Sequence, residues 1–172
     1  MPKTNQSIIN FAVFENGTEF LGVAKVSVPD VKYLTQTISG AGIAGNLEHP
    51  VIGHLDAMTL GINFNSLTSA ASNLSEPRPH TIELRIAEQS EDIALAQLGV
   101  TSIKHVFVIL PKTVKGGTVA PASSSDASGE YACHYWKEII DGVTTKEIDP
   151  SNYKCEINGV DYLSDVRKAL GK

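Results

Sequence analysis

The sequence predicts a mainly β protein with one short internal helix and a second helix at the C-terminus. Three dipeptides, Asn16-Gly17, Asp141-Gly142 and Asn158-Gly159, are flanked by runs of apolar and β-branched residues. Such dipeptides tolerate φ > 0 at both positions and reverse a chain within about two residues to form β-hairpins. Only two segments place apolar residues at helical spacing. The length of 172 residues fits a single domain over 1–172.

The N-terminal strands come first. Asn16-Gly17 joins a strand over Phe11–Glu15 to a second strand that starts at Thr18 and extends towards Val28. Pro29 should interrupt the ladder because proline has no backbone N–H to donate. The strand pattern resumes over Val31–Ile38, where β-branched and aromatic residues alternate.

Glycine dominates the next segment. Ser39–Glu48 is a glycine-rich excursion, which Pro50 and Gly53 close before a strand over Leu55–Phe64. Gly40–Gly45 matches G-x-G-x-x-G, a pattern that binds dinucleotides when a helix follows the third glycine. Here the chain breaks at Pro50 and no βαβ crossover follows, so a long flexible loop is favoured. A small nucleotide-binding enzyme using Gly40–Gly45 is the alternative hypothesis.

The strand over Leu55–Phe64 and the segment after it have clear faces. Alternation along the strand turns four apolar side chains inward: Met58, Leu60, Ile62 and Phe64. The residues that face outward are small and uncharged: Ala57, Thr59, Gly61 and Asn63. Asn65 or Ser66 then caps a short helix that ends before Pro77. Its apolar residues recur at i, i+3, i+4 and i+7: Leu67, Ala70, Ala71 and Leu74.

Two long strands and a loop follow. Thr81–Gln89 and Ser102–Leu110 form a pair joined by a hairpin over Ser90–Gly99. The first strand turns Ile82, Leu84 and Ile86 to one side and Thr81, Glu83 and Arg85 to the other. Lys115–Gly129 is rich in Gly, Ser, Ala and Pro, which predicts an exposed flexible loop.

The C-terminal third, Glu130–Asn158, reads as three short strands closed by a helix that carries Leu163, Val166 and Leu170. If side chains alternate strictly along the first strand, each of its two faces is partly apolar. One face carries Tyr131, Cys133, Tyr135, Lys137 and Ile139, and the other carries His134, Trp136, Glu138 and Ile140. Such a strand needs cover on both faces, from its own chain or from another copy. This is the first indication of an assembly subunit.

The net charge and the lack of long apolar runs argue against two classes of function, nucleic-acid binding and membrane anchoring. The chain has 14 Lys and Arg against 19 Asp and Glu, a net charge of −5, which argues against tight binding to a phosphate backbone. No apolar run reaches the roughly 18 residues of a membrane span, and Met1–Gln6 lacks a signal core. We therefore expect no membrane anchor and assembly in the cytoplasm.

The sequence offers no catalytic, cofactor or metal site. Cys133 and Cys155 are expected to be packed thiols, because a reducing compartment disfavours disulfides. The five histidines are scattered at 49, 54, 80, 105 and 134, and only the loosely placed pair His49 and His54 approaches the spacing of a zinc site. Cys133-His134 cannot act as nucleophile and base if the two point to opposite faces of a strand. Non-enzymatic function is the expectation.

An ordered set of segments resembles a known family over about residues 11–170. The segments are Asn16–Ala24, Gly40–Gly45, Cys133–Trp136, Ile140–Gly142, Glu147–Asp149 and Asn158–Asp161. They resemble the major tail tube protein of P2-like contractile-tailed phages, a family that also serves R-type bacteriocins, or tailocins.

The resemblance implies a β-sandwich or barrel-like subunit that forms hexameric rings, whose inner strands join across subunits into one continuous barrel. Rings would stack into a hollow conduit for DNA or ions inside a sheath, with tape measure, baseplate hub and tail terminator proteins as further partners. The place of action would be a virion tail or tailocin particle.

The resemblance also implies that segment 39–52 is a loop reaching the adjacent ring. Its candidate contact residues are Ser39, Gly40, Ala41, Gly42, Ile43, Ala44, Gly45, Asn46, Leu47 and Glu48. Thr59, Asn63, Thr81, Glu83 and Arg85 are candidate lumen-facing residues, and an acidic wall would let DNA slide without sticking. A β-barrel nucleic-acid binder is a third hypothesis, which the net charge disfavours.

Overall fold

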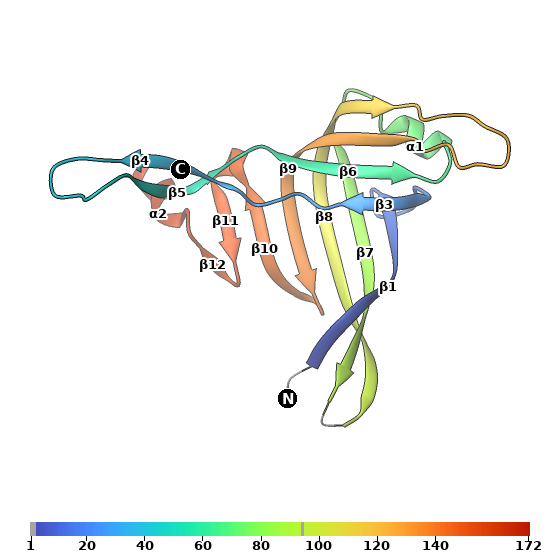
Figure 1. The fold of residues 1–172 in the computed structure, drawn as a ribbon, viewed down its shortest axis with the longest axis horizontal. Helices are drawn as coiled ribbons and strands as arrows, with labels where there is room; N and C mark the ends of the chain where they lie inside the picture. The colour runs from blue at the N-terminus through green and yellow to red at the C-terminus, as the bar shows by residue number, and fades with distance from the viewer. Residues whose placement is uncertain (1–2, 94) are drawn as a thin grey trace.

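The structure is a computed structural model that describes residues 3–93 and 95–172. It is mainly β, with two short α-helices and one 3-10 helix (Figure 1). In chain order the elements are β1 (Lys3–Glu15), β2 (Glu19–Phe20), β3 (Val23–Ser27), β4 (Tyr33–Ile38), β5 (Leu47–Leu55), β6 (Met58–Phe64), α1 (Ser69–Asn73), β7 (His80–Asp92), β8 (Gln97–Lys115), β9 (Ser128–Ile140), β10 (Val143–Asp149), η1 (Pro150–Asn152), β11 (Lys154–Ile157), β12 (Val160–Asp161) and α2 (Ser164–Ala169).

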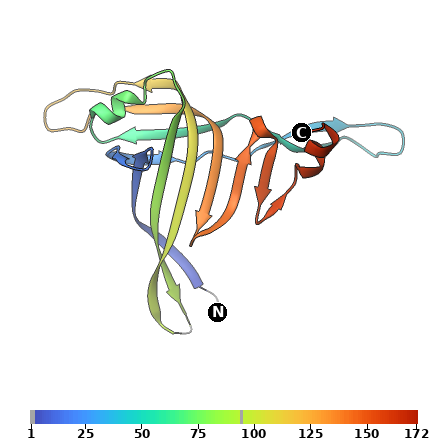
Figure 2. The same ribbon diagram turned by 180° about the vertical axis from the view of Figure 1, so that it is seen from behind.

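One antiparallel sheet branches at β9. Its main path runs β12-β11-β10-β9-β8-β7-β1-β2, while β6 and β3 join through β9. β8 occupies one edge of β9, so the other edge is divided: β6 pairs with Ser128–Cys133 and β10 pairs with Trp136–Ile140. Figures 1 and 2 show β6 and β3 extending to the side of the molecule that carries α1, while β10–β12 lie towards the side that carries the β4–β5 arm. The branch creates two layers with the core between them.

A β-bulge at His134 marks the branch. Cys133 pairs with Ile109 and Tyr135 with Val108, so one residue of β9 has no counterpart on β8. A bulge of this kind shifts the alternation by one residue. Cys133 and Trp136 are both buried as a result, and the expectation that they lie on opposite faces was wrong.

The core confirms the expected inward set of β6. Its buried residues come from the branched sheet and α1: Val13, Leu21, Met58, Leu60, Ile62, Phe64, Ala70, Ala71, Leu74, Ile82, Leu84, Phe107, Ile109, Ala127, Tyr131, Cys133, Trp136 and Ile148. Across the β8–β9 pair, the Phe107 and Trp136 ring centroids are 6.0 Å apart, within the range in which aromatic rings attract.

The N-terminal hairpin is shorter than expected. β2 covers only Glu19–Phe20 before Leu21 is buried and Gly22 turns the chain with φ +62. β3 then leaves β1 and pairs with β6. The expected continuous strand to Val28 was therefore wrong, because burial of Leu21 and the left-handed glycine redirect the chain.

Several other boundaries differ. Thr68 caps α1, accepting from Ala71 N at 3.1 Å, instead of Asn65 or Ser66. β7 and β8 extend into the expected Ser90–Gly99 hairpin, leaving 93–96 as the turn; position 94 lies outside the described residues. The connection between β8 and β9 is 116–127, and β9–β12 make four strands where three were expected.

A buried polar pair holds the β1–β2 turn against the start of β7. Glu15 and His80 are 2% and 1% exposed, and His80 Nδ1 lies 2.6 Å from Glu15 Oε1. His80 Nε2 lies 3.1 Å from the Glu76 carbonyl, which can only accept, so Nε2 donates. Arg78 Nη2 approaches the same Glu15 oxygen at 3.5 Å. The carboxylate is therefore paired with two side chains.

We expect Glu15→Ala to cost about 3–5 kcal/mol of the free energy of unfolding, because it leaves the Nδ1 of the buried His80 imidazole without its partner; Arg78 keeps its pairing with Glu76. Urea titration followed by Trp136 fluorescence measures this. Glu19→Ala changes an exposed carboxylate on the neighbouring strand and should stay within about 0.5 kcal/mol. Equal effects of the two substitutions would contradict the role given to Glu15.

Candidate assembly surfaces

The sheet has open edges at two places. The outer edge of β1 meets β2 only at Phe14 and Glu15, with one further bond from Leu21 N to Val13 O. β9 pairs with β8 no further than Ile103, so within the described residues β8 has no strand on that side over Gln97–Thr101. Such edges offer unpaired N–H and C=O groups to another strand.

Asp141 forms the last hydrogen bonds to β8 before its open edge begins. Asp141 N donates to Ser102 O at 2.8 Å, and its Oδ1 accepts from Ser102 N at 2.9 Å. The side chain and the main chain of one residue therefore replace a ladder partner at Ser102. The open stretch of β8 begins directly beyond it.

An apolar patch surrounds these edges. Its members are more than half exposed and come from β1, the 93–96 turn and β8: Ile8, Ile9, Ile93, Leu95, Leu98 and Val100. By register Ile8 shares a face with Thr101, whereas Leu98 and Val100 point to the other face, so exposed apolar residues flank the open edges on both faces of the sheet. Exposed apolar side chains beside unpaired strand edges indicate an interaction site.

β4 and β5 form a separate two-stranded arm (Figure 1). Every residue of β4 is exposed, and only Gly53 and Leu55 of β5 are half-buried. The glycine-rich connection is 39–46, so residues 47–52 of the expected loop are strand, and Leu47 and Glu48 lie in it. Pro50 is tolerated because β5 has a free outer edge that needs no donor.

The arm is attached at its root to the C-terminal elements. A Cβ placed on Gly53, which has φ +70, would meet Leu163 Cδ2 at 2.1 Å. Leu163 is 4% exposed and leads into α2. An apolar pocket of about 390 Å³ lies between arm and C-terminal elements, lined by Tyr33, Pro50, Val51, Ile52, Gly53, Cys155, Ile157 and Tyr162. The root therefore touches the C-terminal elements closely at Gly53 and Leu163 and leaves an apolar pocket beside this contact, while the rest of the arm is exposed.

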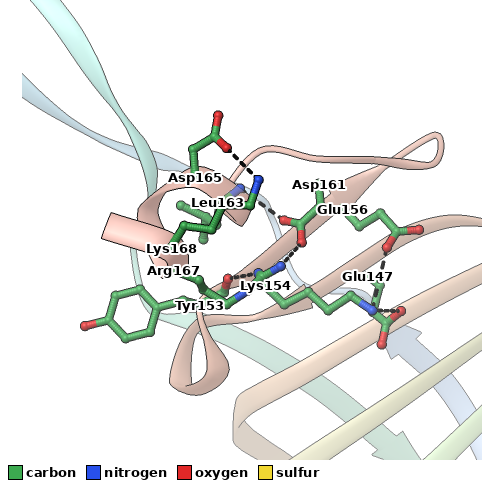
Figure 3. Close-up of polar contacts among 9 residues, drawn as sticks. All are labelled: Glu147, Tyr153, Lys154, Glu156, Asp161, Leu163, Asp165, Arg167 and Lys168. Atoms are coloured by element: carbon green, nitrogen blue, oxygen red, sulfur yellow. Dashed lines mark hydrogen bonds and ion pairs between the residues drawn. The ribbon is translucent and has the colours of Figure 1, made fainter. Parts of the chain in front are cut away.

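Ion pairs fix the C-terminal elements (Figure 3). Arg167 bonds the Tyr153 carbonyl at 2.6 Å and the Asp161 carboxylate, and Leu163 N donates to Asp161 Oδ1 at 3.0 Å. The hydrogen bond from Arg167 lowers the pKa of Asp161. On the adjacent strands, Lys154 Nζ lies 2.7 Å from Glu147 and lowers the pKa of that carboxyl.

All five candidate lumen residues share the face of the sheet opposite the core. Thr59 lies opposite Ala132, which lies opposite Leu110, while Thr81 lies opposite Val108. Leu110 and Val108 are two residues apart on β8 and point the same way. Asn63 lies an even number of residues from Thr59 on β6, and Glu83 and Arg85 lie an even number from Thr81 on β7. The alternation of side chains therefore places these three residues on the same face.

Charges on this face occur in pairs. Glu83 lies 2.7 Å from Arg85 Nη2 and 3.1 Å from Lys104 Nζ. The hydrogen bond from Arg85 is the largest cause that lowers the pKa of Glu83. The Arg85 guanidinium also lies 4.5 Å from the centre of the Phe14 ring. The Glu83 carboxylate therefore offsets only one of its two cationic neighbours, so this cluster has mixed charge with a cation in excess.

The residues weighed for chemistry are held in packing roles. Burial raises the pKa of Cys133 to about 12, which leaves a thiol and not a nucleophilic thiolate. His105 Nδ1 accepts from Trp136 Nε1 at 3.2 Å, and burial lowers its pKa. No group of three or more His, Cys, Asp or Glu gathers around a possible metal position in the described part of the chain.

The Gly40–Gly45 segment is the tip of the arm. β5 begins at Leu47, so a strand follows the third glycine where a dinucleotide site needs a helix N-terminus. No helix among the described residues is long and apolar enough to span a membrane.

Comparison with known proteins identifies the family. The profile of the family described as "Phage tail tube protein FII" matches residues 5–171. The chain belongs to this phage tail tube family. The tail tube protein of Escherichia phage P2 is 25% identical over 169 residues, covering 92% of this chain and 93% of that protein. The resemblance inferred from the sequence is confirmed.

Solved structures agree with the fold of this tail tube family member. A chain of an extracellular contractile injection system, the PVC sheath-tube complex in its extended state, aligns with a TM-score of 0.51 and 14% identity, covering 75% of this chain and 87% of that one. A chain of the PVC sheath/tube terminator in its extended state aligns at 0.48 with 15% identity, covering 73% and 88%. The first of these supports the mainly β tube fold.

Sequence reasoning missed two features of these surfaces. The first strand of the arm, β4, was expected, but residues 47–52 of β5 were expected as part of a loop, although the strand pattern resumes there on the far side of the glycines. The pairing of Arg167 with Asp161 joins α2 to the end of β12, and a spacing of six residues gives little signal for it. No short sequence motif marks either feature.

Gly53→Ala tests the root of the arm. Gly22 has a similar φ of +62, but a Cβ there meets nothing within 4 Å, so Gly22→Ala should cost only the left-handed strain of about 1–2 kcal/mol. Gly53→Ala should cost a further ~1–3 kcal/mol of the free energy of unfolding, because its methyl group overpacks Leu163.

Urea denaturation of both variants measures the difference. In a double-mutant cycle, Gly53→Ala should be less costly when Leu163 is already Ala. Equal losses for Gly22→Ala and Gly53→Ala would show that Leu163 does not press on Gly53.

Proposed function

We propose that this chain is the structural subunit of the inner tube of a contractile tail or tailocin, where hexameric rings stack into a hollow conduit for DNA or ions. The observation that carries the proposal is the match of the tail tube family to residues 5–171. The relative of similar length in phage P2 is named a tail tube protein, and a chain of similar fold comes from a sheath-tube complex.

The open sheet edges support joining between copies. β1 and the Gln97–Thr101 part of β8 leave edges that strands of neighbouring copies would complete into a continuous barrel around the ring. Closure satisfies backbone groups that an isolated subunit leaves to water. The apolar patch beside these edges, from Ile8 to Val100, would be buried by the same contact.

The face that bears Thr59, Asn63, Thr81, Glu83 and Arg85 is our proposal for the lumen wall. Glu83 there offsets one of its two cationic neighbours, Arg85 and Lys104, and the chain as a whole carries a net charge of −5. A face with few unbalanced cations on an acidic chain would bind DNA phosphates weakly and leave passage unobstructed.

The arm with its tip at 39–46 is proposed to contact the adjacent ring. The other partners follow from the place of the tube in the particle: the sheath outside, the tail terminator at one end, the baseplate hub at the other and the tape measure protein within. The chain has no enzymatic role in this proposal. Assembly takes place in the bacterial cytoplasm and the product is a virion tail or tailocin particle.

Electron microscopy tests the assembly. Purified protein, alone and coexpressed with its sheath partner, should yield rings or hollow tubes, because the open edges of one copy are completed by the next. Sedimentation of the same samples gives the mass of the ring. A monodisperse monomer at high concentration, with no tubes beside the sheath protein, would refute the proposal.

Cysteine labelling tests which face lines the conduit. Arg85→Cys or Asn63→Cys in assembled tubes should react with a small maleimide, which diffuses along the bore, but not with one attached to a protein-sized carrier. Reaction with both reagents would put the face on the exterior, and reaction with neither would put it in a contact between copies. Dissociated subunits, which should react with both, are the control.

A further inference from the structure

Two turns of the chain contain a dipeptide whose two residues can react with each other. The sequence has two Asn-Gly dipeptides, Asn16-Gly17 and Asn158-Gly159. Both form left-handed turns, with φ of 50 at each asparagine and of 77 and 80 at the glycines. Glycine has no side chain to shield its backbone nitrogen. Asparagine followed by glycine is therefore a pair in which this nitrogen readily attacks the side-chain amide.

The reaction is an intramolecular displacement. The backbone nitrogen of the glycine bonds to Cγ of the asparagine, the bond from Cγ to the amide nitrogen breaks, and ammonia leaves with the proton that the backbone nitrogen gives up. Water then adds to either carbonyl of the five-membered succinimide ring and opens it to aspartate or isoaspartate. Each conversion makes the net charge of −5 one unit more negative, and isoaspartate adds one carbon to the main chain.

The turn conformation opposes this reaction at both positions. The ring closes only when Cγ and the next backbone nitrogen lie on the same side of the Cα–C bond. In a turn with φ > 0 at both central residues, type I′, this nitrogen points away from Cγ. Each asparagine therefore has to leave its turn conformation before it reacts. The rate then depends on how often the hairpin opens locally.

The turn at Asn16 is held closed by β7. Asn16 N donates to Thr81 O at 2.9 Å, and Arg85 Nη2 donates to Gly17 O at 3.2 Å. A Cβ placed on Gly17 would lie 3.2 Å from Glu83 Oε1. Both residues of this dipeptide are therefore bonded to the neighbouring strand, and a side chain lies close beside the glycine.

The turn at Asn158 lies at the margin of the sheet. It joins β11 to β12, a strand of two residues at the end of the sheet path. Asn158 N donates to Thr145 O at 2.8 Å, which matches the bond at Asn16. The surroundings differ, because residues 158–160 are all exposed and a Cβ placed on Gly159 would meet nothing within 4 Å. Opening this turn disrupts little packing.

We propose that Asn158 is the principal site of spontaneous deamidation in the folded chain, whereas the contacts with β7 protect the same dipeptide at Asn16. The reacting residues are identical at the two positions, so the difference in rate comes from the surrounding structure. This inference concerns the folded chain itself and does not depend on assembly into tubes. The β11–β12 turn is then the place where the covalent structure of the chain changes with age.

Peptide mapping tests the site. The purified full-length chain is kept in mildly alkaline buffer, in the folded state and in urea, and digested with trypsin after increasing times. Residues 155–167 and 4–25 form the tryptic peptides that carry Asn158 and Asn16. Fragmentation in the mass spectrometer locates each conversion, and methyl transfer by an isoaspartate methyltransferase identifies isoaspartate. Asn158 should convert several-fold faster than Asn16 in the folded chain, and the two should convert at similar rates in urea.

Three results would overturn the inference. The first is equal or faster conversion at Asn16 in the folded chain, and the second is no conversion at either asparagine. The third is the same ratio of rates in urea, which would assign the preference to the adjacent residues in the sequence. Amide hydrogen exchange of the unmodified chain measures the opening directly and should be faster at Asn158 than at Asn16; the reverse order also contradicts the inference.

Arg85→Ala tests the protection of Asn16. The substitution removes the hydrogen bond to Gly17 O, so conversion at Asn16 in the folded chain should rise about 2- to 10-fold, and the rate at Asn158 should stay the same. The matched control is Lys104→Ala, which removes the other cation beside Glu83 and should leave both rates unchanged. An unchanged rate at Asn16 in the Arg85→Ala chain would show that β7 does not protect this turn through Arg85.

Discussion

The division of one edge of β9 between two partner strands determines the rest of the structure. A strand can bond to only one neighbour on each edge at a given residue. β6 takes Ser128–Cys133 and β10 takes Trp136–Ile140, so the sheet must separate into two layers where these partners part. The bulge at His134 falls between them and turns Trp136 into the core. Without it, the tryptophan and the residues that follow would face outward.

This branch also connects the arm to the core. β5 leads almost directly into β6, with Asp56 N bonded to Lys32 O at 2.8 Å across the root. The other side of the root rests on Leu163, which the pairing of Asp161 with Arg167 holds in place. The exposed arm is therefore continuous with a strand whose inward residues are completely buried. A load on its tip would be carried into the most closely packed part of the subunit.

Local signals in the sequence predicted the fold class and much of the strand order. Asn16, Asp141 and Asn158 all adopt positive φ at the turns expected for them, and β6 buries the side chains that its alternation selected. These features depend on a few neighbouring residues. The bulge at His134, the continuation of β5 through Pro50 and the Glu15–His80 pair depend on partners far away in the sequence, and they were missed. Of the surfaces, sequence could name the glycine-rich tip and the strand before it, but not that β5 begins at Leu47 and completes the arm.

The two cysteines have a consequence for the life of an assembled particle. Both thiols are buried and free, and burial raises the pKa of each. Thiol–disulfide exchange needs an accessible thiolate, so oxidising surroundings would neither join neighbouring copies through these cysteines nor oxidise the two side chains. The covalent structure of the chain is therefore independent of the redox state of its surroundings.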